Sequence, residues 1–302
     1  MSKRVRFEKQ NIKETRQNIA SASDSLYRSY SRAMVGRSGI LAFRTARSPH
    51  PLKYTAARAP RNRLVLTQAF LSMPTHFSFA EVQLAESPAS LASTSVPGSY
   101  GWTPVMPLIR ALSTYLPHLQ ALSASSPFWA GDRTGYASNR ALVFQQLPTA
   151  GLPWLLDDWA AFEAYLDDMV RTGVMEDATE VRWDIRPAPR WGTIEVRACD
   201  GMSTLPELAA VAALIQVLVE HFSRRLDAGE ELTGIQPWFL RENKWRAARY
   251  GLDAEIIVDR DGTLAPVRQH LRDVLDDLAE ISVQLKCAKE FAGVEKILAT
   301  GA

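Results

Sequence analysis

Apolar residues in the last two thirds of the chain recur at two spacings, and together these predict an α+β fold. From Leu108 to Leu122 they return every three or four positions, as on one face of a helix. The same period predicts further helices over residues 159–169, 204–226, 237–250, 266–281 and 285–298. Residues 209–219 carry no charge. We therefore expect the helix that contains them to lie buried against a sheet.

Two neighbouring segments alternate apolar and polar residues instead, which predicts strands. The first reads Trp-Asp-Ile-Arg-Pro over 183–187, and the second reads Gly-Thr-Ile-Glu-Val-Arg over 192–197. Side chains of a strand alternate between its two faces, so each segment has an apolar side and a charged side. The pair is expected to form a β-hairpin whose polar face carries Asp184, Arg186, Glu195, Arg197 and Cys199. A further short strand is expected over residues 256–258.

The charged face of this hairpin suits a metal-bound phosphate. The carboxylate of Glu195 is a hard oxygen ligand for Mg²⁺, and the guanidinium of Arg197 can grip a phosphoryl oxygen. An exposed ladder of ion pairs gives the same pattern and needs no ligand. Spacing alone leaves both interpretations open.

Charge divides the chain into two parts. Residues 1–104 hold 15 Lys and Arg against 5 Asp and Glu, whereas residues 105–302 hold 20 against 28. The first part is rich in Ser and Arg and has poor periodicity, so we expect a poorly organised basic segment over 1–104 and a catalytic domain over 105–302. A basic segment is also typical of nucleic-acid binding, which stays as a rival function.

Several site classes find no support in the sequence. The two cysteines, Cys199 and Cys287, lack the spacing of a zinc site or disulfide scaffold, and the five histidines show no pair at ligand spacing. There is no Walker-type phosphate loop. No run of about 18 apolar residues occurs, and charged residues follow Met1, so we expect a cytoplasmic protein that does not enter the membrane.

Five motifs, in order, resemble those of the carboxylate-amine ligases of the type 2 glutamate–cysteine ligase family. Besides the two strand segments they are Ser-Ala-Ser-Ser-Pro-Phe-Trp over 123–129, Gly-Tyr-Ala-Ser-Asn-Arg over 135–140 and Glu-Asn-Lys-Trp-Arg-Ala-Ala-Arg-Tyr-Gly over 242–251. The resemblance implies a glutamine synthetase-like catalytic fold, in which a curved antiparallel sheet carries helices on its outer face. It implies a glutamyl phosphate made from ATP and glutamate with Mg²⁺, then amide formation with an amino acid amine. It leaves a homo-oligomer open.

The resemblance also assigns expected roles to individual residues. Glu195 would hold Mg²⁺, Arg197 would contact the transferred phosphate, and Arg140 would bind the substrate carboxylate. The expected substrate pocket includes Tyr136, Ser138 and Arg186, although Arg186 serves equally well as an ion-pair partner of Asp184. The residues expected to meet the nucleotide are Asn243, Arg246 and Arg249, for which a solvated helix surface is the alternative.

Two features of the family are absent before residue 105. The amino-terminal strand with consecutive glutamates and the His-x-His-x-Gly motif are missing, and Leu-Ala-Ser-Thr-Ser-Val over 91–96 stands in place of the second. We expect a fold that is incomplete on its N-terminal side, with residues up to about 104 translated out of frame or replaced. Translation of the gene's other frames tests this. A non-catalytic, nucleotide-binding member of the family is therefore an alternative to an active ligase.

Overall fold

The computed structural model describes residues 63–67, 79–85, 105–189 and 193–301. The chain divides into compact units over 1–47 and 48–302, and the first of these lies outside the described residues. The second unit mixes helices and strands, which confirms the predicted combination of element types.

The central sheet has four antiparallel strands in the order β1-β2-β8-β7. Strands β7 (Ile185–Ala188) and β8 (Thr193–Asp200) form the predicted hairpin, with Arg186 directly opposite Glu195. The apolar positions Val181, Trp183 and Ile185 are buried, so alternation along the strand separates the core from the charged face.

The other two strands come from the part of the chain in which we predicted no element. Strands β1 (Arg63–Thr67) and β2 (Phe79–Ala85) pair with each other, and β2 pairs with β8 along its other edge. The sequence of β2 does alternate in its middle, where Glu81, Val82, Gln83 and Leu84 are polar and apolar in turn. Because β2 is short and stands among Ser- and Pro-rich stretches, periodicity alone did not single it out.

Helices α3 (Val105–Ser113) and α4 (Leu116–Ser123) replace the single helix predicted over 108–122. The chain turns at Thr114 and Tyr115, and Pro117 then stands in the first turn of α4, where its missing N–H costs no helical hydrogen bond. Both helices are almost fully buried, and α4 packs against β8.

Helix α7 (Leu205–Asp227) forms the centre of the core. A capping box between Thr204 and Glu207 starts it, as the sequence predicts, and α7 packs against α3, α9 (Val267–Gln284) and α10 (Ala288–Thr300). By length and composition α7 could cross a membrane, but most of its surface is buried inside the protein. A core helix meets the same criterion, so this feature is weak evidence for a membrane.

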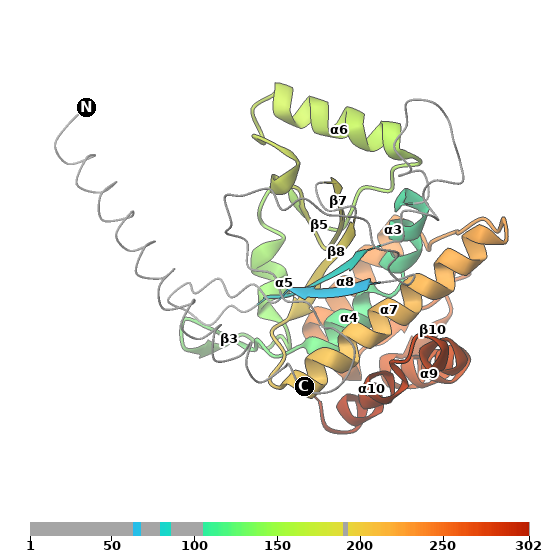
Figure 1. The fold of residues 1–302 in the computed structure, drawn as a ribbon. Coiled ribbons are helices and arrows are strands. Elements are labelled where there is room, and N and C mark those ends of the chain that lie inside the picture. The colour runs from blue at the N-terminus through green and yellow to red at the C-terminus, as the bar shows by residue number, and fades with distance from the viewer. Residues whose placement is uncertain (1–62, 68–78, 86–104, 190–192, 302) are drawn as a thin grey trace, which may run out of the picture. The chain divides into compact units, whose positions relative to one another are not determined.

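The remaining elements surround the sheet. In Figure 1, α7 lies between the sheet and the pair α9 and α10, whereas α6 (Trp159–Arg171) lies at the opposite end, where its Phe162 ring meets Trp183. Helix α8 (Pro237–Tyr250) has the predicted bounds and ends at Gly251, whose φ is +57°. The short elements are β3 (Phe128–Trp129), β4 (Asp132–Arg133), α5 (Asn139–Phe144), β5 (Ala150–Gly151), η1 (Ala178–Glu180), β6 (Arg182–Trp183), η3 (Gly251–Asp253), β9 (Glu255–Ile257) and β10 (Leu264–Pro266).

Candidate functional site

Glu195 stands at the centre of the charged face of the hairpin. Its side chain is only 2% exposed, and each carboxylate oxygen accepts a hydrogen bond from a different guanidinium. Arg186 Nη2 lies 2.8 Å from Oε2, and Arg197 Nη1 donates to Oε1. The side chains of Arg186 and Arg197 are 11% and 16% exposed. Glu195 and Arg197 therefore do not point into bulk solvent, which an exposed ladder of ion pairs would require.

The two arginines keep Glu195 ionised. Burial by itself raises the pKa of this carboxyl, but the positive charges and hydrogen bonds of Arg186 and Arg197 outweigh burial and hold the pKa below its ordinary value. Two cations around one acid leave this group of three with a net positive charge. Such a group attracts an anion.

Arg186 is fixed from both sides. Its Nη1 donates to the carbonyl of Thr179 at 2.7 Å and to that of Val181 at 2.5 Å, while its Nη2 binds Glu195. The alternative partner considered for Arg186 was Asp184, and the structure gives that acid to another residue. Arg186 is thus held in one orientation by the backbone that precedes β7.

A bulge changes the direction of side chains in the second half of β8. The register with β2 shifts between Ala80 and Val82, opposite the stretch from Val196 to Cys199. As a result Cys199 leaves the charged face and enters the core, where its sulfur contacts the Leu119 carbonyl at 3.8 Å. The prediction that Cys199 shares a face with Glu195 was therefore wrong. Burial raises the pKa of this thiol to about 11.

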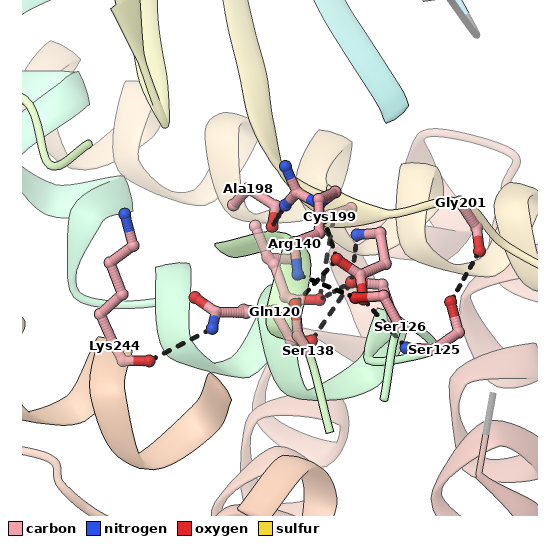
Figure 2. Close-up of polar contacts among 12 residues, drawn as sticks. Gln120, Ser125, Ser126, Ser138, Arg140, Ala198, Cys199, Gly201 and Lys244 are labelled. Atoms are coloured by element: carbon pink, nitrogen blue, oxygen red, sulfur yellow. Dashed lines mark hydrogen bonds and ion pairs between the residues drawn. The ribbon is translucent and has the colours of Figure 1, made fainter. Parts of the chain in front are cut away.

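Beyond the bulge, Asp200 collects donors from two segments, residues 125–126 and residues 138–140. Its carboxylate accepts hydrogen bonds from Ser126 Oγ at 2.7 Å, Ser138 Oγ at 2.8 Å, Arg140 Nε at 2.6 Å and the Ser125 amide at 3.0 Å. Figure 2 shows Ser126, Ser138 and Arg140 converging on the end of β8, between Ala198 and Gly201. We call these five residues the Asp200 hub.

Two residues of the hub, Arg140 and Ser138, were expected to contact substrate. Arg140 is 3% exposed, and its Nη2 also donates to the Ala198 carbonyl at 2.6 Å. Ser138 is fully buried. The structure thus holds both side chains against β8, and a contact with a substrate carboxylate remains a prediction for Arg140 and for Ser138. Sequence analysis missed Asp200, the last residue of β8, because its donors lie at least 60 positions earlier in the chain.

The Phe144 ring connects the Asp200 hub with the hairpin face. The guanidinium carbon of Arg140 lies 6.0 Å from the ring centroid, and that of Arg197 lies 5.9 Å from it. Both distances are typical of cation–π contacts. Arg140 and Arg197, chosen from separate motifs, therefore lie near one another around a single aromatic ring.

Lys244 is a second residue that sequence analysis missed. Its Nζ lies 2.5 Å from Asp184 Oδ2, and both side chains are buried. The backbone of Lys244 is held too, because the Gln120 amide nitrogen donates to its carbonyl, a contact visible in Figure 2. On α8, Leu240, Lys244 and Ala247 follow the helical period and are buried together, so periodicity could have marked this lysine.

The residues expected to meet the nucleotide lie on the same helix, in different surroundings. Asn243 is fully buried, and its side-chain amide donates to the carbonyl of Ile257 at 2.7 Å and accepts from its amide at 2.8 Å. Arg246 binds Glu242 at 2.8 Å and the Glu255 carbonyl at 3.1 Å. These contacts tie α8 to β9, which is a structural role for Asn243.

Arg249 turns toward the predicted pocket loop. Its guanidinium carbon lies 5.0 Å from the centroid of the Tyr136 ring. A Cβ on Gly135 would come within 2.5 Å of Arg249 Nη1, and Gly135 has φ +78°, so both space and backbone favour glycine there. The structure therefore brings Tyr136 and Arg249 together. Among the contacts between described residues, none links either of them directly to Glu195.

The family follows from comparison with known proteins. The profile of glutamate–cysteine ligase family 2 matches residues 98–302. The chain belongs to this family. Among curated relatives, a protein of Leifsonia xyli subsp. xyli named "Putative glutamate--cysteine ligase 2" is 60% identical over 197 residues, which is 65% of this chain and 52% of the relative. A protein of the same name from Mycobacterium tuberculosis is 54% identical over 198 residues, 66% of this chain and 53% of the relative.

This member of glutamate–cysteine ligase family 2 spans about half the length of those curated relatives. A solved structure with a related fold is glutamate–cysteine ligase from Francisella tularensis in complex with AMP. The TM-score is 0.53 at 11% identity, over 74% of this chain and 57% of the other. At this identity the likeness concerns the fold alone.

Proposed function

We propose that the chain carries the nucleotide half of an ATP-dependent carboxylate-amine ligase of the glutamate–cysteine ligase type. Family membership supports the reaction class. The carrying observation is geometric: a buried, ionised Glu195 lies between Arg186 and Arg197 on one face of a hairpin. These are the groups that a phosphoryl transfer needs, because its catalysis consists of positioning and charge neutralisation.

The proposed reaction has two steps. A γ-carboxylate oxygen of glutamate attacks the γ-phosphorus of ATP, the bond to ADP breaks, and ADP leaves with the electron pair. The amine nitrogen of the acceptor then attacks the acyl carbon, phosphate leaves, and the amine proton passes to solvent or phosphate. Arg197 and Arg186 would each offer a guanidinium to the oxygens of the transferred group. Cysteine is the acceptor suggested by the names of the relatives.

The proposal includes an Mg²⁺ ion that would be bound by one protein residue, Glu195. The described residues contain no group of three or more His, Cys, Asp or Glu side chains that could hold a metal. Glu195 would contribute a single carboxylate, and nucleotide phosphates and water would supply the rest, as is usual for Mg²⁺. When bound, the ion neutralises charge between the phosphates.

The substrate and nucleotide contacts extend the proposal along Phe144 and α8. Arg140, with Ser138 and Tyr136, would meet the glutamate carboxylate, and Arg246 and Arg249 would meet the nucleotide. The buried position of Asn243 favours a supporting role for it. A curved sheet of the glutamine synthetase-like kind, a cytoplasmic location and a homo-oligomeric assembly are further parts of the proposal.

Phosphate release tests this function. The full chain is incubated with ATP and Mg²⁺, with and without glutamate and a panel of amino acids, and released phosphate is measured. We expect release that requires glutamate and an amine, and a fall of about 100-fold in Glu195→Gln. Arg272→Met is the matched control, because Arg272 forms an exposed ion pair with Glu295 on the helices α9 and α10.

Two other outcomes would replace the proposal. Thermal stabilisation by ATP without turnover indicates a non-catalytic nucleotide-binding protein of the family. Salt-sensitive DNA binding that disappears when the basic residues before β1, 1–62, are deleted indicates the nucleic-acid function instead. Glutamate-independent phosphate release equal in wild type and Glu195→Gln would contradict the role of this site.

A further inference from the structure

A buried ion pair between Lys244 and Asp184 lies near the arginines of the site, and the sequence did not predict that these two residues bind each other. Lys244 reaches from α8 to Asp184, which lies at the junction of β6 and β7. The Asp184 amide donates to the Gly151 carbonyl at 2.7 Å, and its carbonyl accepts from the Arg197 amide at 2.7 Å. The backbone of Asp184 is thus hydrogen-bonded to both β5 and β8.

Without Lys244, Asp184 would compete with Glu195 for the same cation, Arg197. Continuing the register of Ile185 with Val196 places Asp184 directly opposite Arg197, on the face that carries Glu195. Side chains directly opposite each other on neighbouring strands lie close enough for charges to pair. An unneutralised Asp184 carboxylate would therefore attract the Arg197 guanidinium away from Glu195.

We propose that Lys244 is a positioning residue for the phosphate-binding arginines: by occupying Asp184, its ammonium keeps Arg197 on Glu195 and available to a nucleotide phosphate. The inference rests on the proposed function. Among the described residues, Lys244 also adds to the positive charge of the face, on which Asp184 and Glu195 stand against Arg186, Arg197 and Lys244. Loss of the ammonium lowers the positive charge that attracts a phosphate.

A buried ion pair is a poor source of stability, because both charges lose their hydration. Removing one partner leaves a buried charge without compensation, whereas removing both can leave stability unchanged. If the pair also controls where Arg197 lies, single and double variants should differ in activity in the same way. Lys244→Met leaves Asp184 free to capture Arg197, whereas Asp184→Asn with Lys244→Met leaves no competing acid on the face.

The test is a double-mutant cycle on the full chain with wild type, Lys244→Met, Asp184→Asn and the double variant. Glutamate-dependent phosphate release gives kcat and KM for ATP, and calorimetry gives the affinity for ADP, all at temperatures where each variant is folded. We expect kcat to fall tenfold or more in Lys244→Met and the double variant to recover most of that loss, a strong coupling between the two sites. Arg272→Met controls for the loss of an ordinary ion pair, and Lys244→Arg, which keeps the charge, should stay within a few-fold of wild type.

Each result separates the inference from the proposed function. Wild-type turnover combined with unchanged kcat in folded Lys244→Met, or with losses that simply multiply in the double variant, overturns the inference alone. An inactive wild type overturns the proposed function, and the ADP affinities of the same four proteins then decide the inference by the same pattern. Absence of both turnover and ADP binding overturns both. If Lys244→Met does not fold, a double variant whose kcat still falls tenfold or more below wild type contradicts the role of Lys244.

Discussion

The Asp200 hub and the Glu195 face use the same chemical pair, an arginine and a carboxylate, in two different ways. Asp200 accepts from two serine hydroxyls, one backbone amide and one guanidinium, and both it and Arg140 are almost fully buried. Glu195 accepts from two guanidinium groups whose side chains reach the surface. Neutral donors fixed by the backbone cannot follow a new anion, whereas a long guanidinium side chain that reaches the surface, as that of Arg197 does, can turn toward one.

This difference separates a structural carboxylate from one suited to a ligand. Asp200 joins the loop before β3, the loop before α5 and the end of β8, so its donors come from the framework itself. At the Glu195 face, an incoming phosphate can take over the guanidinium of Arg197, while Arg186 stays bound to the backbone and to Glu195. We therefore expect changes at the hub to act on stability and changes at the face to act on turnover.

The largest expected effect is on stability, at the hub. Asp200→Asn replaces one acceptor oxygen by an NH₂ group that faces Ser and Arg donors and leaves the Arg140 charge buried. We expect the free energy of unfolding to fall by about 3–5 kcal/mol, as for a broken buried ion pair. Urea denaturation followed by circular dichroism measures it.

Ser126→Ala is the graded control for the hub: it leaves the carboxylate with three donors and also removes the hydroxyl that accepts from the Arg140 amide. It should cost about 2 kcal/mol for the two hydrogen bonds. If Asp200→Asn were no less stable than Ser126→Ala, the distinction between a structural hub and an exchangeable face would be lost.

The next effect is on turnover, at the face. Arg197→Lys keeps the positive charge but removes the planar fork, and Arg186 still pairs with Glu195. We expect glutamate-dependent phosphate release to fall by about 100-fold, whereas the free energy of unfolding changes by less than about 1 kcal/mol. Steady-state kinetics and urea denaturation are measured on the same preparation.

Arg272→Lys serves as the matched change at an exposed ion pair and should alter neither quantity. A loss of stability in Arg197→Lys as large as that of Asp200→Asn would show that the face, too, is part of the framework.

Some features of the fold and of the site could be predicted from the sequence, and others could not. The hairpin and the bounds of α8 follow from local periodicity and from caps such as Gly251. These features are determined by residues close in sequence, so a pattern suffices to predict them.

Partner choice was harder to predict because it depends on contacts between distant segments. Nothing in the sequence near Asp184 shows that Lys244, sixty positions later, will bind it. The bulge in β8 that turns Cys199 into the core depends on β2, in a part of the chain where no element was predicted. The predicted roles of Arg140 and Ser138 likewise took no account of Asp200.

A pH titration gives a smaller effect and tests the electrostatics of the face. Because the pKa of Glu195 is held below its ordinary value of 4.5, its ionised form stabilises the folded protein above that pH, and this contribution is lost as the pH falls through the folded-state pKa. Glu195→Gln cannot titrate. The stability difference between wild type and variant should therefore shrink below pH 4.5, with a slope of at most about 1.4 kcal/mol per pH unit.

Urea denaturation of both proteins between pH 3 and pH 7 provides the measurement. A difference that stays constant across this range would mean that Arg186 and Arg197 do not hold the carboxylate of Glu195 in its charged form.

The smallest expected effect concerns Cys199, next to the hub, which should not react with a thiol reagent in the folded protein. Cys199 is buried in the core, and burial raises its pKa to about 11, so almost no thiolate is present at neutral pH and a reagent cannot reach it. Cys287, which is half-buried, should react first with a thiol reagent in the folded protein. Mass spectrometry of the labelled protein, with Cys287→Ser as the control, should show no modification of Cys199 until urea unfolds the chain. Labelling of Cys199 in the native Cys287→Ser protein would mean that the β8 bulge opens, and that the hub is no more rigid than the face beside it.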